Sequence, residues 1–238
     1  MSRFSVACLD MAGTTVRDDN TVMEAFGAAI ASQRRPAGGF DEAMQYARAT
    51  MGQSKIEVFR HIFRVPGVPG VPGGEEAAQA ANAAFEKHYA GAVADGEIAP
   101  MPGAEELFAA CRSAGIRVCL CTGFSPLTRD AIIAALGWRP LVDLVLSPAD
   151  AGRGRPWPDM PLTALLRLGG DSVASLAVAG DTPADIESGL RAGAGLVAGV
   201  LSGDSQRSEL AAVPAATGLP GTPLILDSVA DLLPRLVG

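Results

Sequence analysis

Acidic and hydroxyl side chains stand directly after short apolar runs of this sequence, at positions where they could carry out a reaction. Asp10 ends the run FSVACL of residues 4–9, and Thr122 follows an apolar run in CLCTGFS. Asp181 and Asp185 lie in VAGDTPADIESG, again after apolar residues. An aspartate can attack phosphorus and hold an aspartyl-phosphate. Two further carboxylates beside it form the oxygen-rich kind of site that Mg²⁺ prefers.

A cation and a hydroxyl would complete such a site, although each of these residues also has a purely structural interpretation. Arg155, in GRGRPWPDM, can neutralise a phosphoryl group, and the Thr122 hydroxyl can bind a phosphoryl oxygen. The alternatives are a turn aspartate at Asp10, a strand-ending turn at Thr122, a helix cap at Asp181 or Thr182 and a solvent-facing arginine, a role that suits Arg153 better. Capping and metal binding are compatible, so a cap does not exclude a site.

The elements that must position these residues alternate between strand and helix. The apolar runs predict strands at Phe4–Leu9, Ile116–Cys121, Leu141–Leu146, Leu176–Ala179, Gly195–Val200 and Pro223–Leu226. Helical spacing predicts helices at Ala104–Ala114, Leu127–Leu136, Pro161–Leu168 and Pro183–Ala192. Strands separated by helices favour right-handed crossovers and a parallel sheet. We therefore expect an α/β fold with a doubly wound, Rossmann-like parallel sheet, in which the carboxyl ends of the strands form the ligand crevice.

The segment after the first strand has a different character. It is rich in Ala, Glu and Gln with apolar residues at helical spacing, as in VMEAFGAAIASQ and EEAAQAANAAFEKHYAG. We predict an inserted helical cap domain over residues 18–99 and a core made of residues 1–17 and 100–238. The Pro-Gly repeat VPGVPGVPGG, Val65 to Gly74, predicts a loop within the insert. The tail after Ser202 is ambiguous apart from its strand and a closing helix.

The bulk composition excludes several classes of protein. The chain has 238 residues, of which 48% are hydrophobic and 19% charged, and a net charge of -7, so we expect neither disorder nor nucleic-acid binding. No apolar run reaches the length of a membrane span, and the first residues do not resemble a secretory signal. The four cysteines lack zinc-ribbon spacing, so we interpret them as buried free thiols in a reducing cytoplasm rather than as metal ligands or disulfides.

The order Asp10, Thr122, Arg155 and Gly-Asp-x-x-x-Asp (Asp181 to Asp185) resembles the four motifs of the haloacid dehalogenase superfamily across most of the chain. That family has a Rossmann-like core with a mobile cap inserted after the first motif, as the helical insert suggests here. The resemblance implies a magnesium cofactor. It also implies a metal-binding set, which comprises Asp10, Ala12, Asp181 and Asp185.

One branch of the superfamily matches more closely. Most phosphatases of the superfamily carry a second aspartate two residues after the nucleophile, where this chain has Ala12, which cannot transfer a proton. DMAGTTV and GRPWPDM resemble motifs of the phosphonoacetaldehyde hydrolases (phosphonatases), and MGQSKIEVF resembles their M-G-x-x-K segment. In that family the lysine forms a Schiff base with the substrate aldehyde, which implies this role for Lys55. The implied catalytic residues are Asp10, Lys55, Thr122 and Arg155, and the implied substrate-binding residues are Ala12, Gly13, Thr14, Met51, Gly52 and Gly123.

The resemblance fits the chemistry, because an iminium on Lys55 could accept the electrons of a breaking carbon–phosphorus bond and make an acid at position 12 dispensable. The chain departs from the branch at Val58, where phosphonatases have a histidine, and at Phe124, where they have a tyrosine. The resemblance therefore implies that the substrate is phosphonoacetaldehyde or another 2-oxoalkylphosphonate. A phosphomonoesterase acting on a small phosphate ester and a catalytically silent binding protein are the alternatives. Family members commonly pair into homodimers through their caps.

Overall fold

Six short apolar segments form one parallel sheet in the computed structural model, which describes residues 2–17, 19–33, 36, 38–64 and 72–238. The strands are β1 (Val6–Asp10), β4 (Arg117–Cys121), β5 (Leu144–Leu146), β6 (Leu176–Gly180), β7 (Leu196–Val200) and β8 (Leu224–Leu226). Their order across the sheet is β5-β4-β1-β6-β7-β8, and each neighbouring pair is parallel. The first strand in sequence thus lies in the middle of the sheet, with crossovers to both sides.

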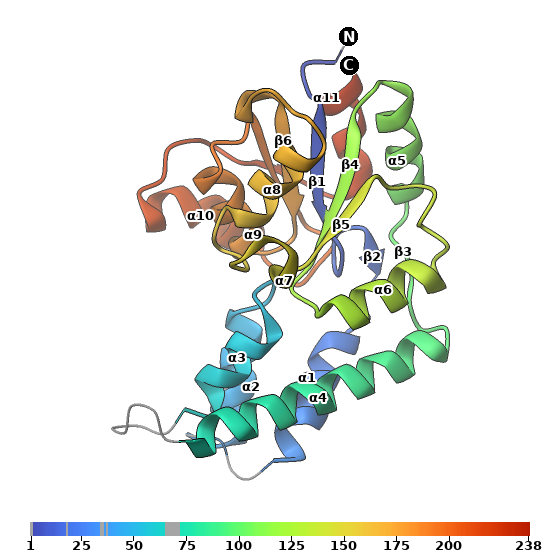
Figure 1. Ribbon diagram of the computed structural model, residues 1–238. Coiled ribbons are helices and arrows are strands. Elements are labelled where there is room, and N and C mark those ends of the chain that lie inside the picture. The colour runs from blue at the N-terminus through green and yellow to red at the C-terminus, as the bar shows by residue number, and fades with distance from the viewer. Residues whose placement is uncertain (1, 18, 34–35, 37, 65–71) are drawn as a thin grey trace.

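Helices cover both faces of the sheet (Figure 1). The helices of this part of the chain are α5 (Ala104–Ser113), α6 (Pro126–Ala135), α7 (Pro148–Ala151), α8 (Asp159–Arg167), α9 (Pro183–Arg191), α10 (Arg207–Thr217) and α11 (Leu233–Val237), with 3₁₀ turns at Val173–Ser175 and Val229–Leu232. Alternate residues of β1 point to opposite faces. Leu9 packs in the cluster that holds Phe108 of α5, while Cys8 packs in the cluster that holds Met160 of α8. The strands are therefore buried on both sides, which explains why they read as continuous apolar runs.

In the sequence, four helices, here called the cap, come between β2 (Val16–Arg17) and β3 (Ala99–Pro100). These two strands pair with each other in a small antiparallel sheet. The four helices are α1 (Thr21–Ala31), α2 (Phe40–Ala49), α3 (Lys55–Ile62) and α4 (Pro72–Ala94). Figure 1 shows them grouped at the end of the sheet opposite to the two chain termini. That end is where the parallel strands terminate, so the cap faces their carboxyl ends.

An aromatic cluster joins the cap to the core. Phe26, Phe59 and Phe85 of the cap pack on one another with ring centroids 5.0 to 6.1 Å apart. Phe124, which follows β4 in the core, lies 4.6 Å from the ring centroid of Tyr89 in α4. Burial of such large rings favours a cap that rests against the sheet. Among the described residues, no helix is both long enough and apolar enough to span a bilayer.

The predicted α/β fold with a helical cap is confirmed, with shifts at element ends. Strand β5 begins at Leu144 instead of Leu141, because Leu141 closes a turn with Trp138 and the Asp143 carboxylate accepts the Val118 N–H at 2.9 Å. Strand β1 extends through Asp10 itself.

The loop predicted for Val65 to Gly74 falls mainly on residues 65–71, outside the described residues, and its last three residues instead open α4, where a proline needs no N–H partner. The sequence did not predict the structure of the segment between Ser202 and the last strand. This segment forms α10 before β8. The assignment of residues 18–99 to a separate domain stays a prediction.

Candidate active site

Three aspartates meet at the carboxyl end of the sheet and are called here the acid cluster. Asp10 ends β1, Asp181 follows β6, and Asp185 lies in the first turn of α9. Strands β1 and β6 are neighbours, which brings residues distant in sequence together. All three side chains are buried, and one carboxylate oxygen from each lies within 4.8 Å of the others. The arrangement that strand-end positions predicted is present.

The turn after β1 is shaped to fit against Asp181. The Met11 carbonyl accepts backbone N–H groups from residues 14 to 16, which folds the chain back tightly. Gly13 has a φ of +84°, and a Cβ there would lie 2.5 Å from Asp181 Oδ2, so only glycine fits. Thr14 Oγ1 donates to Asp181 Oδ1 at 3.0 Å. The AGTT segment thus forms one wall of the acid cluster.

Helix α9 begins with a capping box that orients Asp185. Thr182 is the N-cap residue, Pro183 takes the first helical position, and Asp185 Oδ2 accepts the Thr182 N–H at 3.1 Å. Asp181 is therefore not the cap, and its carboxylate faces the cluster instead. The other oxygen of Asp185, Oδ1, accepts from Arg155.

Arg155 is the cation at the centre of the cluster. Its Nη1 donates to Asp10 Oδ1 and to Asp185 Oδ1, and its side chain is buried. Its Nε has no hydrogen-bond partner. Arg153, by contrast, is exposed and pairs with Asp159 at 2.7 Å, as expected for a surface arginine. Arg155 is thus positioned to hold the Asp10 carboxylate and to meet an anion.

The acid cluster carries more negative charge than Arg155 neutralises. Burial is the main cause that raises the pKa of Asp10 to about 7; the positive charge of Arg155 opposes this rise and the Asp185 carboxylate contributes to it. Burial also raises the pKa of Asp181 well above its ordinary value, with Asp10 and Asp185 as further causes. When all three carboxylates are ionised, one guanidinium leaves two negative charges in a buried site. A divalent cation would remove this imbalance.

Thr122 and Gly123 follow β4 and meet the cap. Thr122 is buried, and its Oγ1 accepts the Phe124 N–H at 3.2 Å. A Cβ on Gly123 would lie 2.3 Å from the carbonyl oxygen of Gln53 in the turn between α2 and α3. A Cβ on Gly52 in the same turn would lie 2.6 Å from Thr182 Oγ1. This turn, residues 50–54 and called here the cap turn, is therefore held between two core loops of the site.

Lys55 is the first residue of α3, directly after the cap turn. Its backbone N–H donates to the Gly123 carbonyl at 3.3 Å, and its side chain is 6% exposed. Its Nζ lies 5.4 Å from the Phe26 ring centroid and 5.2 Å from that of Phe124. The amine is thus brought from the cap to the core loops, between two aromatic rings.

Several of the predicted site residues line two cavities, whereas Asp10, Thr122 and Asp185 line neither. Lys55, Gly123 and Arg155 line one of about 620 Å³, and Ala12, Gly13, Met51 and Asp181 line another of about 370 Å³. The cap turn contributes to both. Arg155 connects them, since it lines the larger cavity and also bonds the acid cluster.

Some residues at the site were not predicted from the sequence. Ser202 Oγ donates to the Gly13 carbonyl at 2.8 Å, and its position just after β7 follows the same strand-end rule that found Asp181. Glu86 of α4 accepts from Ser125 Oγ at 2.6 Å across the cap–core boundary, a tertiary contact that no local pattern announces. His61 stacks on Tyr46 at 3.8 Å between ring centroids, so it packs within the cap.

Sequence comparisons place these features among known proteins. Residues 4–193 match the family of haloacid dehalogenase-like hydrolases. The phosphonoacetaldehyde hydrolase of Pseudomonas fluorescens (strain Pf0-1) is 35% identical over 106 residues, which cover 44% of this chain but only 38% of that enzyme. The enzyme of the same name from Klebsiella pneumoniae is 30% identical over 219 residues, covering 86% of this chain and 78% of that enzyme.

Solved structures share the fold over nearly the whole chain. A hydrolase from Pseudomonas syringae aligns with a TM-score of 0.78 at 21% identity, covering 97% of both chains. A phosphonoacetaldehyde hydrolase-like protein from Oleispira antarctica aligns with a TM-score of 0.74 at 25% identity, covering 97% of this chain and 90% of that one.

Proposed function

The chain belongs to the haloacid dehalogenase-like hydrolases, and we propose that it hydrolyses the carbon–phosphorus bond of a 2-oxoalkylphosphonate, such as phosphonoacetaldehyde, with Mg²⁺ as cofactor. The position of Lys55 carries this proposal. A buried lysine amine lines the same cavity as Arg155, while the residue two after Asp10 is an alanine. Relatives named phosphonoacetaldehyde hydrolase support the same assignment.

Lys55 would activate the carbonyl group of the substrate. A lysine attacks a carbonyl only as the neutral amine. The neutral amine adds to the carbonyl carbon and water leaves, which gives an iminium. The iminium is the electron acceptor that a breaking carbon–phosphorus bond requires, because an unactivated carbon is a very poor leaving group.

Asp10 would take up the phosphoryl group. Its carboxylate forms a bond to phosphorus as the carbon–phosphorus bond breaks, and the electron pair of that bond moves into the iminium to give an enamine. Water then releases phosphate from Asp10. The enamine carbon takes a proton, and hydrolysis of the imine frees Lys55 and the carbonyl product. No alkoxide leaves in this series of reaction steps, so the reaction does not need an acid at the position of Ala12.

Arg155 and the core loops would hold the phosphonate. Arg155 already bonds Asp10, and its Nε has no protein partner, which leaves a donor for a phosphonate oxygen. Thr122 Oγ1 accepts from the chain, so its O–H proton is available to a second oxygen. The backbone around Gly13 and Thr14 completes the pocket.

The residues of the acid cluster fit a magnesium ion. Their ligand atoms are all carboxylate oxygens, which suit a hard cation, and their uncompensated charge matches a divalent one. Asp10, Asp181 and Asp185 would hold it, with Ala12 contributing only through its carbonyl. The metal would lower the repulsion between the phosphonate and the nucleophile.

Phosphate-ester hydrolysis is the second candidate, because the acid cluster and Arg155 would serve an ester equally well. Ala12 counts against it, since no acid stands there to protonate a leaving alkoxide. Turnover of p-nitrophenyl phosphate at a rate above that of phosphonoacetaldehyde would favour this candidate.

Imine trapping tests the proposal directly. The chain has two lysines, Lys55 and Lys87, so peptide mapping can assign a lysine adduct to one of them. The protein is incubated with phosphonoacetaldehyde and Mg²⁺, with and without borohydride, and phosphate release and adduct mass are measured. We expect turnover that borohydride quenches and one adduct, located on Lys55 by peptide mapping. Lys55→Arg should lose turnover and adduct together, while Lys87→Arg, changed on the exposed face of α4, should keep both.

Turnover that survives Lys55→Arg would refute the Schiff-base step.

The pairing of two chains through their caps, which the family resemblance implies, is a separate part of the proposal. Sedimentation equilibrium across a range of concentrations tests it, and a monomer at every concentration would contradict it.

A further inference from the structure

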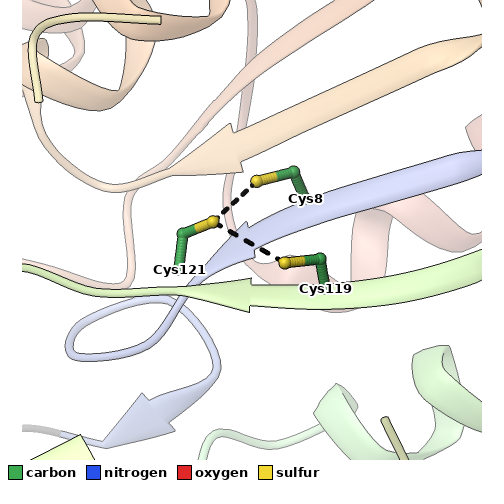
Figure 2. Close-up of side chains that lie close together, drawn as sticks. All are labelled: Cys8, Cys119 and Cys121. Atoms are coloured by element: carbon green, nitrogen blue, oxygen red, sulfur yellow. Dashed lines mark hydrogen bonds between the residues drawn. The ribbon is translucent and has the colours of Figure 1, made fainter. Parts of the chain in front are cut away.

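Three of the four cysteines gather on one face of the sheet (Figure 2). Cys8 lies on β1 and pairs in register with Cys119 of the neighbouring strand β4. Cys121 is two residues further along β4, so its side chain points to the same face. Figure 2 shows the three side chains converging between the two strands. Each is at most 5% exposed.

The spacing of the sulfur atoms approaches that of a metal–thiolate site. Cys119 Sγ and Cys121 Sγ are 3.8 Å apart, Cys8 Sγ and Cys121 Sγ are 2.9 Å apart, and all three lie within 4.8 Å of one another. Metal–sulfur bonds of about 2.3 Å at tetrahedral or trigonal angles separate two sulfur atoms by about 3.8 to 4 Å. One pair already has this spacing, and the other reaches it if the Cys8 side chain shifts by about 1 Å.

The surroundings of the thiols favour a soft ion. The cluster packs against Met160, Ala164 and Leu165, which offer no oxygen or nitrogen side-chain ligands. Among the described residues, no fourth His, Cys, Asp or Glu joins this group. A sulfur-only, three-coordinate site disfavours Mg²⁺, which requires oxygen ligands, and suits Cu⁺ better than four-coordinate Zn²⁺.

We propose that Cys8, Cys119 and Cys121 form a binding site for one soft metal ion of the Cu⁺ class. On binding, sulfur–metal bonds replace S–H bonds, and the displaced protons pass to solvent. The site is separate from the acid cluster, although it lies near the carboxyl ends of β1 and β4. Cys8 is two residues before Asp10, and Cys121 directly precedes Thr122. An ion that moves the Cys8 side chain therefore acts on the strand ends that carry the nucleophile.

Binding is measured on the fully reduced protein without oxygen, with Cu⁺ supplied from a competing chelator. We expect one Cu⁺ per chain after desalting, and loss of that copper in Cys121→Ala. Cys111→Ala is the matched control, because Cys111 is equally buried but lies on α5 outside the cluster. Asp10→Asn should also keep its copper, so the result does not depend on the proposed hydrolytic function.

X-ray absorption on the copper-loaded wild-type protein gives a second readout that requires no variant. A shell of sulfur neighbours only, at about 2.3 Å, supports the site. A shell of oxygen or nitrogen, no copper retained by the reduced wild type, or equal loss in Cys111→Ala would each overturn it.

Discussion

The variant Gly123→Ala tests whether catalysis requires the cap turn to contact the core. In Gly123→Ala the new Cβ would lie 2.3 Å from the Gln53 carbonyl oxygen, whereas ordinary contact begins at 3.4 Å. Both partners are main chain, so no side-chain rotation relieves the overlap, and the turn must retreat by about 1 Å. A displacement of about 1 Å in a reacting group costs on the order of 10²-fold in rate, or roughly 2.7 kcal/mol. Lys55 follows the turn directly and bonds the Gly123 carbonyl, so it should move with the turn.

The assay is kcat/KM for phosphate release from phosphonoacetaldehyde, together with the yield of borohydride-trapped Lys55. Both should fall by about a hundredfold in Gly123→Ala, with an unchanged far-UV circular dichroism spectrum. Gly91→Ala is the control, because a Cβ there meets nothing within 4 Å. As a residue of α4, it should gain up to about 1 kcal/mol of stability and keep full activity. Wild-type turnover and trapping in Gly123→Ala would show that the close contact is not needed.

Three further predictions concern the acid cluster. Asp10→Asn should abolish phosphate release, because an amide cannot attack phosphorus, yet still permit trapping on Lys55; measurable turnover would remove Asp10 from the mechanism. Ala12→Asp should raise hydrolysis of p-nitrophenyl phosphate by at least about tenfold by restoring a general acid, and an unchanged rate would show that proton transfer is not what esters lack here. Burial raises the pKa of Asp10 from 3.8 to about 7, so the folded protein holds this proton more tightly than the unfolded chain. Stability of the metal-free protein should therefore fall as the pH rises between these values. Since Mg²⁺ binds the ionised form, it should raise Tm more at about pH 8 than at about pH 5, and equal shifts in thermal unfolding scans would contradict the metal assignment.

The sheet and most of the acid cluster were predictable from sequence for a physical reason. Strands buried on both faces read as unbroken apolar runs, and parallel strands end at one edge, so the residues after those runs converge. Asp10 and Asp181 follow this rule. Arg155 could be assigned a role by its chemistry and motif, but its bonds to Asp10 and Asp185 depend on the path of the loop before α8.

Other contacts depend on tertiary packing and have no local signal. Lys55 was identified only through a family motif, since a lysine at the start of a helix is otherwise unremarkable. Its approach to Gly123 depends on how the cap rests on the core. The cysteine cluster required the strand order as well. Alternation along β4 places Cys119 and Cys121 on one face, but only the pairing of β1 with β4 brings Cys8 beside them.

The short antiparallel pair β2–β3 has a consequence for how such a protein can diversify. The chain leaves the core at Val16–Arg17 and returns at Ala99–Pro100, and these residues are hydrogen-bonded neighbours. An insert whose two ends are adjacent can change in length, or be exchanged whole, without any strand of the main sheet being repositioned. Lys55 on the insert and Asp10 on the sheet can therefore be inherited separately. A hydrolase core could in this way acquire new substrates by exchange of the insert, with the exchange point confined to two short strands.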